Sequence, residues 1–168
     1  MRVKTLIAGL AAAAIVSLPT ISAAENHAAS ESPVALAKEY LAAYSTFDVT
    51  IMEPFLAEEM VFNDPTSTNQ NANGEPFFFE GKQAVLKGLG DIAVMYASFT
   101  LDYNIERQYE SHGVVVFIAQ LTYMGETKNG DKFEGGAPIV TAITIKDGKV
   151  VRHMDYFDYK KNAEDFSK

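Results

Sequence analysis

A histidine and an aspartate stand two residues apart near the C-terminus, in the segment VVRHMDYFDY. Residues two apart on a β-strand point to the same face, so His153 and Asp155 share one face among apolar neighbours. Burial against such neighbours perturbs the pKa of a titratable group, and an ionised carboxylate is costly to bury unpaired. We therefore predict that Asp155 is protonated or is paired with His153 or Tyr40. This pair is either an acid–base pair at a pocket or a structural pair within the sheet.

A second carboxylate, Asp64, follows a short apolar strand and precedes a proline. An aspartate in this position can reach a cavity as a general base, or it can close an Asx-turn with its own backbone. Tyr40 and Tyr44 are four residues apart in a helical pattern and share the apolar face of that helix. Tyrosines in such positions either pack in the core with a satisfied hydroxyl or offer that hydroxyl to a ligand.

A β-hairpin is predicted to position the histidine and its neighbouring aspartate. Asp147-Gly148 separates two apolar runs rich in β-branched residues, which is a strong signal for a two-residue hairpin loop. A regular register counted from this loop pairs Ala142 with His153 and Val140 with Asp155. We therefore expect Val140 and Ala142 on the inward face of the hairpin.

The rest of the chain predicts helices first and strands later. Ser32-Pro33 is an N-cap followed by proline at the first helical position, and Asp48 can cap a second, short helix. A third helix is expected from Lys82, while the alternation over 99–106 and the apolar run over 114–124 predict strands. This grouping predicts the α+β class, with N-terminal helices packed on one face of a curved sheet.

The N-terminus is typical of a secretory signal. Arg2 and Lys4 precede an apolar stretch that is too short to span a membrane, and Ser22-Ala23-Ala24 supplies small residues for cleavage. We expect a signal peptide over 1–24, a disordered leader over 25–32, a single domain over 33–160 and a polar tail over 161–168. The expected location is the periplasm or the extracellular medium.

Composition excludes several kinds of partner. The chain has 14 basic and 22 acidic residues and no basic cluster, so nucleic acid and, after cleavage, membrane are not expected partners. There is no cysteine, which excludes a disulfide framework. A His-x-Asp pair supplies only two metal ligands, and no phosphate-binding glycine loop occurs. We therefore expect neither a metal nor a cofactor.

The order of elements and three motifs resemble the nuclear-transport-factor-two-like superfamily, which includes ketosteroid isomerases, SnoaL-like polyketide cyclases and limonene epoxide hydrolases. Phe62-Asn63-Asp64-Pro65 is similar to the segment that carries the general base of the isomerases. FEGKQAV at 79–85 is similar to the start of the third helix. DGKV at 147–150 followed by DYFD at 155–158 is similar to the end of the epoxide hydrolases. The resemblance implies a cone-shaped fold in which a strongly curved, mixed, mostly antiparallel sheet encloses an apolar cavity.

The resemblance implies roles for single residues, but neither catalytic set is complete. Asp64 matches the isomerase base, and Tyr40 resembles the tyrosine that donates to a developing oxyanion. The isomerases also use a protonated acid on a strand, where the expected register offers Val140 and Ala142. The hydrolases need an arginine and a second aspartate, where this chain has Thr122 and Met124.

Two hypotheses about function follow. The first is an enzyme that acts on a small, largely apolar molecule by cofactor-free proton transfer of isomerase or cyclase type. In this case Asp64 is the base, Tyr40 the donor, and Asp155 with His153 a second acid–base pair. The second is a non-catalytic module of the same fold that binds a hydrophobic ligand or dimerises. In both cases we expect a homodimer, and we expect the ligand to contact five further residues: Tyr44, Phe62, Val140, Ala142 and Phe157.

Overall fold

The computed structural model describes residues 32–68, 70 and 73–166 of the chain. The predicted signal peptide and all of the predicted leader except Ser32 lie outside these residues. In the described part no helix is long and apolar enough to cross a membrane. The elements run in the order α1 Pro33–Ser45, α2 Val49–Met52, a 3-10 turn Glu53–Phe55, β1 Leu56–Asp64, β2 Phe77–Glu80, α3 Lys82–Ala93, β3 Tyr96–Ser111, β4 Val114–Thr127, β5 Lys132–Lys146, β6 Lys149–Phe157 and α4 Tyr159–Phe166.

The predicted helix starts are confirmed. The Ser32 side chain accepts a hydrogen bond from the backbone N–H of Ala35 at 3.2 Å, and Asp48 accepts one from Thr50 at 2.9 Å. Such caps satisfy backbone N–H groups that have no partner within the helix. Pro54 lies in the 3-10 turn after α2, as expected for a residue that cannot continue a helix.

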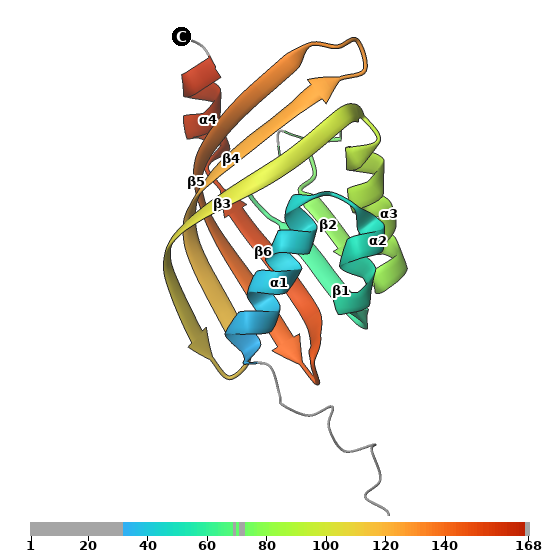
Figure 1. Cartoon of the computed structure of the whole chain (residues 1–168), viewed down its shortest axis with the longest axis vertical. Coiled ribbons are helices and arrows are strands. Elements are labelled where there is room, and N and C mark those ends of the chain that lie inside the picture. The colour runs from blue at the N-terminus through green and yellow to red at the C-terminus, as the bar shows by residue number, and fades with distance from the viewer. Residues whose placement is uncertain (1–31, 69, 71–72, 167–168) are drawn as a thin grey trace, which may run out of the picture.

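The strands form a six-stranded mixed sheet in the order β2-β1-β6-β5-β4-β3. β1 pairs with β6 in parallel, and the other neighbours are antiparallel. The sheet is curled but not closed, and α1, α2 and α3 lie on its concave side (Figure 1). The predicted α+β class, with helices packed on a curved and mostly antiparallel sheet, is confirmed.

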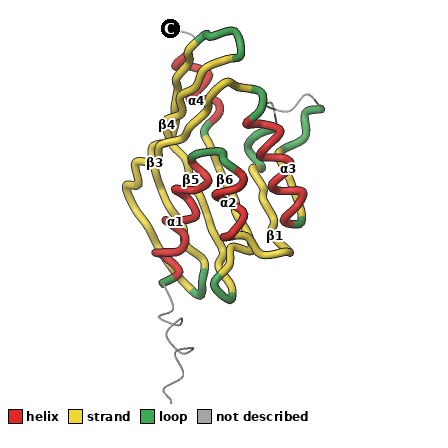
Figure 2. The backbone as a smooth tube through the Cα atoms, turned by 45° about the vertical axis from the view of Figure 1, so that its right-hand side comes forward, coloured by secondary structure: helices red, strands yellow, loops and turns green. Residues whose placement is uncertain are grey.

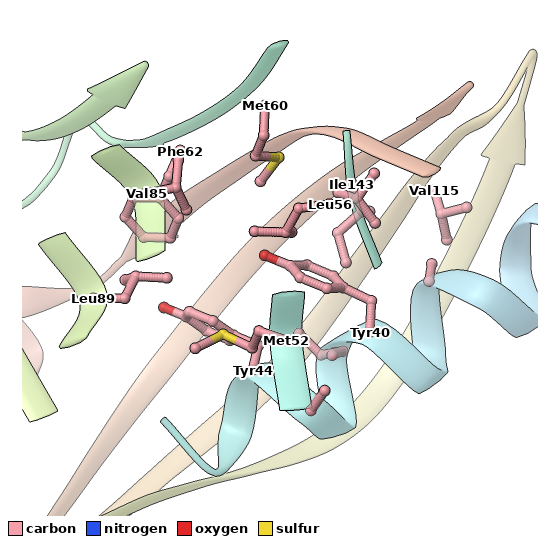
Figure 3. Packing of buried hydrophobic residues seen from close by; sticks show 14 of the residues in the cluster. Tyr40, Tyr44, Met52, Leu56, Met60, Phe62, Val85, Leu89, Val115 and Ile143 are labelled. Carbon is pink, nitrogen blue, oxygen red and sulfur yellow. The ribbon is translucent and has the colours of Figure 1, made fainter. Parts of the chain in front are cut away.

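The main core fills the space between these helices and the sheet. Tyr40 and Tyr44 of α1 point toward β1, where Leu56, Met60 and Phe62 are buried (Figure 3). From α3, Val85 and Leu89 join the same cluster. A second, smaller cluster lies farther along β4, β5 and β6 and consists of Ala119, Leu121, Ala137, Ile139 and Phe157.

The predicted hairpin is present, but its predicted register is wrong beyond the first pairs. Asp147 and Gly148 both have positive φ, 51° and 70°, and Lys146 pairs with Lys149. The register then shifts between the pairs Ile145–Val150 and Thr144–Arg152. One residue of β6, Val151, is therefore extra, which is the signature of a β-bulge.

The bulge changes which side chains of β5 face the core. His153 pairs with Ile143 and Asp155 pairs with Thr141, instead of with Ala142 and Val140. Thr141 and Ile143 are buried on the inward face, while Val140 is 36% exposed. Val140 and Ala142 thus lie on the outer face of the sheet, contrary to the prediction.

The chain does not end its regular structure at residue 160. Helix α4 spans Tyr159–Phe166 and packs against β5, beside the part of the sheet where β4 ends and β5 begins (Figures 1 and 2). The segment predicted as a polar tail therefore contains most of a helix, and Asn162 of this helix contributes to the cavity described next.

Candidate functional site

A cavity of about 390 Å³ lies between the helices and the inner face of the sheet. This volume is within the range typical of small-molecule sites. Aromatic rings supply much of the wall, including Phe47, Phe62, Phe99, Phe133, Phe157 and Tyr96. Two carboxylates, Asp64 and Asp155, also line it. The predicted apolar cavity is therefore present and contains two acidic groups.

Asp155 is held by three side chains. The Thr141 hydroxyl donates to Oδ1 at 2.5 Å, and the Tyr44 hydroxyl donates to Oδ2 at 3.3 Å. Nε2 of His153 lies 3.0 Å from Oδ1. Its N–H is not directed well enough at Oδ1 to complete a hydrogen bond, so this is a close electrostatic contact. The predicted proximity of His153 and Asp155 is confirmed.

His153 and Tyr40 lie behind the cavity wall. Both side chains are fully buried, neither lines the cavity, and the Tyr40 hydroxyl is 2.9 Å from Nδ1 of His153. With the ring proton on Nε2, facing Asp155, Nδ1 accepts the hydrogen bond from Tyr40. Tyr40 therefore orients the histidine, while Tyr44, one turn later on α1, reaches the cavity.

Asp64 both closes a turn and faces the cavity. Its Oδ1 accepts hydrogen bonds from the backbone N–H of Thr66 at 3.0 Å and from the Thr66 hydroxyl at 2.6 Å, which is an Asx-turn. Its Oδ2 accepts one from the Tyr159 hydroxyl at 2.7 Å. The two interpretations of Asp64 that the sequence left open are thus compatible, because each oxygen serves one of them.

Burial changes the pKa of several groups around the cavity. Desolvation, the largest effect, raises the pKa of Asp64 above its ordinary value, and the negative charge of Asp155 adds to the rise. Hydrogen bonds from Thr66 and Tyr159 oppose it. Burial, with a smaller contribution from Asp155, also raises the pKa of Tyr40, Tyr44 and Tyr103 well above the usual value. These tyrosines are therefore neutral donors at neutral pH.

The structure adds residues that the sequence did not single out as site residues. The Tyr103 hydroxyl is buried at the cavity without a well-formed hydrogen bond, although Thr141 is close enough to affect its pKa. Thr141 was placed on the wrong face by the unbulged register, and Tyr159 fell within the predicted domain, two residues before the predicted tail, and was given no role. The alternation over 99–106 contained the signal for Tyr103, because it is the one hydroxyl-bearing residue on the apolar face of that strand.

The predicted ligand contacts divide into two groups. Tyr44, Phe62 and Phe157 line the cavity. Val140 and Ala142 do not, because the bulge turns them to the outer face. In the part of the chain that the structure describes, no cluster of three or more histidine, aspartate or glutamate side chains could hold a metal ion.

Residues 37–153, more than half of the chain, match the SnoaL-like domain family. The chain belongs to this family. Membership, together with the fold, indicates small-molecule binding or a cyclase-type activity for this SnoaL-like protein. No functionally curated protein matches its sequence.

Three solved structures show the same fold as this SnoaL-like protein. A protein from Shewanella putrefaciens, assigned by name as a SnoaL-like polyketide cyclase, is 20% identical, with coverage of 82% of this chain and 97% of that chain and a TM-score of 0.67. IdmH from Streptomyces antibioticus, also assigned as a polyketide cyclase, is 14% identical, with coverage of 82% and 100% and a TM-score of 0.59. TerC, co-crystallised with polyporic acid, is 18% identical, with coverage of 82% and 100% and a TM-score of 0.58.

Proposed function

We propose that this protein acts on a small, largely apolar molecule by cofactor-free proton transfer of isomerase or cyclase type. One observation carries the proposal: Asp64 faces an aromatic cavity, and burial raises the pKa of its carboxyl group. A general base works best when its pKa lies closer to the working pH than that of an ordinary carboxylate. The cyclase assignments of two structural relatives support the same class of chemistry.

The proposed step is proton abstraction next to a carbonyl group. Asp64 takes the proton, the electron pair of the broken C–H bond forms an enolate, and Asp64 returns the proton to another carbon of the same ligand. The unpartnered hydroxyl of Tyr103 donates to the enolate oxygen, a role that the resemblance to the isomerases implied for Tyr40. Donors held ready for developing charge are a main source of catalysis. Tyr40 and His153 act as positioning residues behind Asp155.

The test uses 2-tetralone, a bicyclic ketone that fits the size of the cavity and has acidic C–H bonds beside its carbonyl. We expect the purified protein to accelerate deuterium uptake from D₂O into these positions, followed by mass spectrometry. Asp64→Asn removes the base while keeping the side-chain shape, and we expect it to lower the rate by about 100-fold or more. Tyr103→Phe lowers it by about 10- to 100-fold.

The matched control is Asp102→Asn. Asp102 is exposed on the outer face of β3, next to Tyr103 in sequence, and it does not line the cavity. This variant removes the same charge and leaves the exchange rate unchanged. Equal rates in the wild type and Asp64→Asn contradict the assignment of Asp64 as the base.

A second candidate is a non-catalytic binding module. It is favoured by the hydrogen bonds of Asp64, since both oxygens already have partners within the chain. In this case 2-tetralone binds in the cavity, as seen by calorimetry, but no variant changes the exchange rate because the protein adds nothing to the background. Binding and exchange measured together therefore separate the two candidates.

We also propose where the protein acts and how it assembles. The N-terminal pattern of basic residues, an apolar stretch and small residues supports export to the periplasm or the medium. Apolar side chains on the outer face of the sheet support a homodimer.

A further inference from the structure

The charge inside the cavity is one-sided. Asp64 and Asp155 both line it, and among its lining residues in the described part of the chain there is no lysine, arginine or histidine. The two carboxylates are close enough for the charge of Asp155 to affect the titration of Asp64. A ligand that enters this space therefore meets negative potential that the wall does not neutralise.

Both carboxylates also have unused acceptor capacity. A carboxylate has about four acceptor positions. Among the described residues, Oδ2 of Asp155 accepts one hydrogen bond, the long one of 3.3 Å from Tyr44, and Oδ2 of Asp64 accepts one, from Tyr159. The described residues that line the cavity include no lysine, arginine or histidine that could donate to these oxygens, and His153, behind the wall, contacts the other oxygen of Asp155, Oδ1, at 3.0 Å. The missing donor is thus something that a ligand supplies.

The aromatic wall favours the same kind of ligand. The faces of phenylalanine and tyrosine rings attract cations, and the attraction is strongest where water is excluded. Tyr44, Phe62 and Phe157 line the cavity together with Asp155. Tyr44 donates to Asp155, and the rings of Tyr44 and Phe62 pack 6.0 Å apart, centroid to centroid. Aromatic rings combined with an acceptor-rich carboxylate form a favourable environment for an ammonium group.

We propose that the cavity selects a ligand with a protonated amine on a flat apolar skeleton and rejects carboxylates of the same shape. The amine lies against Asp155 and the surrounding rings, and the apolar skeleton fills the rest of the cavity. This inference rests on the proposed function, and it also removes a difficulty in it. When the enolate forms, Asp64 has taken the proton and is neutral, but the remaining carboxylate, Asp155, repels the enolate. A cation carried by the ligand offsets this repulsion.

The test compares three ligands with one bicyclic skeleton: 2-aminotetralin, a cation at pH 7, 2-tetralol, which is neutral, and tetralin-2-carboxylate, an anion. We expect calorimetry on the wild-type protein to give an affinity for the amine about 10- to 100-fold higher than for the alcohol, the ratio for a hydrogen bond to a charged group. The carboxylate binds more weakly than the alcohol.

Single substitutions test whether the preference for the amine over the alcohol comes from the carboxylates of the cavity. Asp155→Asn keeps the shape of the side chain and removes its charge, so it reduces the advantage of the amine over the alcohol to less than about threefold. Asp102→Asn, which changes an exposed charge outside the cavity, leaves that advantage intact. The comparison on the wild-type protein does not depend on whether Asp155→Asn folds, and Asp64→Asn supplies a second cavity variant with a partial loss.

The outcomes of these binding measurements distinguish failure of the charge preference from failure of the proton-transfer proposal. Equal binding of amine and alcohol, or strongest binding of the carboxylate, overturns the charge preference and leaves the proton-transfer proposal standing if 2-tetralone still exchanges. An amine preference that survives both Asp155→Asn and Asp64→Asn also overturns the inference, because the cavity carboxylates are then not its source. If none of the three ligands binds and 2-tetralone does not exchange, both proposals fail together.

Discussion

Asp64 is the residue at which burial and hydrogen bonding oppose each other most directly. Desolvation raises the pKa of its carboxyl group more than the hydrogen bonds from Thr66 and Tyr159 lower it. A carboxyl group whose pKa is raised in the folded state stabilises the fold fully below its unfolded pKa of about 3.9. That contribution is lost as pH rises through the folded pKa, because the unfolded chain then releases its proton more readily.

The raised pKa of Asp64 in the folded state predicts how the stability of the protein changes with pH. As pH rises from about 3 to about 7, the free energy of unfolding of the wild type falls relative to that of Asp64→Asn, which has no proton to release. Urea denaturation at a series of pH values measures both curves. Asp102→Asn serves as the control and runs parallel to the wild type. Parallel curves for the wild type and Asp64→Asn would show that the pKa of Asp64 is not raised.

For individual residues, the sequence predicted which side chains lie close together but not which of them line the cavity. The spacing of Tyr40 and Tyr44 placed both on one helix face, and both do reach the His153–Asp155 pair. Whether each of the two tyrosine side chains reaches the cavity depends on the angle at which α1 crosses the sheet. The spacing of residues within one helix does not determine that angle. Tyr44 therefore lines the cavity, and Tyr40 lies behind it.

Among the elements, α3 shows how closely a helix approaches the sheet. A methyl group at Gly88 would lie 2.5 Å from the Phe79 ring, whereas one at Gly90 would lie 3.5 Å from the nearest atom of Val49. Phe79 cannot move freely, because its ring stacks on Phe62 and Phe77. The glycine at 88 thus permits the close contact between α3 and β2.

Two substitutions in this helix are therefore predicted to have opposite effects. Gly90→Ala raises the free energy of unfolding by about 0.5–1 kcal/mol, because alanine is the better helix former. Gly88→Ala lowers it by about 1–3 kcal/mol, because the added methyl group overpacks the contact with Phe79. Thermal and urea unfolding measure both, and Phe79→Leu restores part of the loss in Gly88→Ala. Stabilisation by Gly88→Ala would mean that α3 is free to move away from β2.

The hairpin shows why element type is easier to predict than register. The Asp-Gly loop, the two strands and the inward face of β6 were predicted, and His153, Asp155 and Phe157 are all buried. One extra residue at Val151 then turned β5 relative to β6. A bulge of this kind fits β6 to two neighbours at once, and β1 has its own register shift against β6 at the same level. Pairing with β1 is a long-range property, so the hairpin sequence alone does not reveal it.

For the whole molecule, the predicted order of helices and strands is confirmed from Pro33 to Phe157 except for β2, Phe77–Glu80, which was not predicted. The C-terminal helix was missed because YKKNAEDF is polar overall, so composition made it look like a tail. Its position depends on Tyr159, whose ring packs 4.9 Å from that of Phe157, centroid to centroid, and whose hydroxyl bonds Asp64. A polar segment can thus be ordered by one anchored side chain, a tertiary effect that composition does not contain.

The outer face of the sheet leads to a prediction about assembly. Ile118, Val140 and Tyr156 pair across β4, β5 and β6 and form an apolar row, in which Val140 and Tyr156 are 36% and 43% exposed. Exposed apolar surface of this kind marks interfaces, so we predict that the protein is a homodimer through this face.

Val140→Glu places a charge at the centre of the row and shifts the protein to a monomer in analytical ultracentrifugation, because an unpaired charge is costly to bury. Val94→Glu, at the exposed C-terminal end of α3, leaves the dimer intact. A wild type that sediments as a monomer, or a dimer that survives Val140→Glu, contradicts this interface.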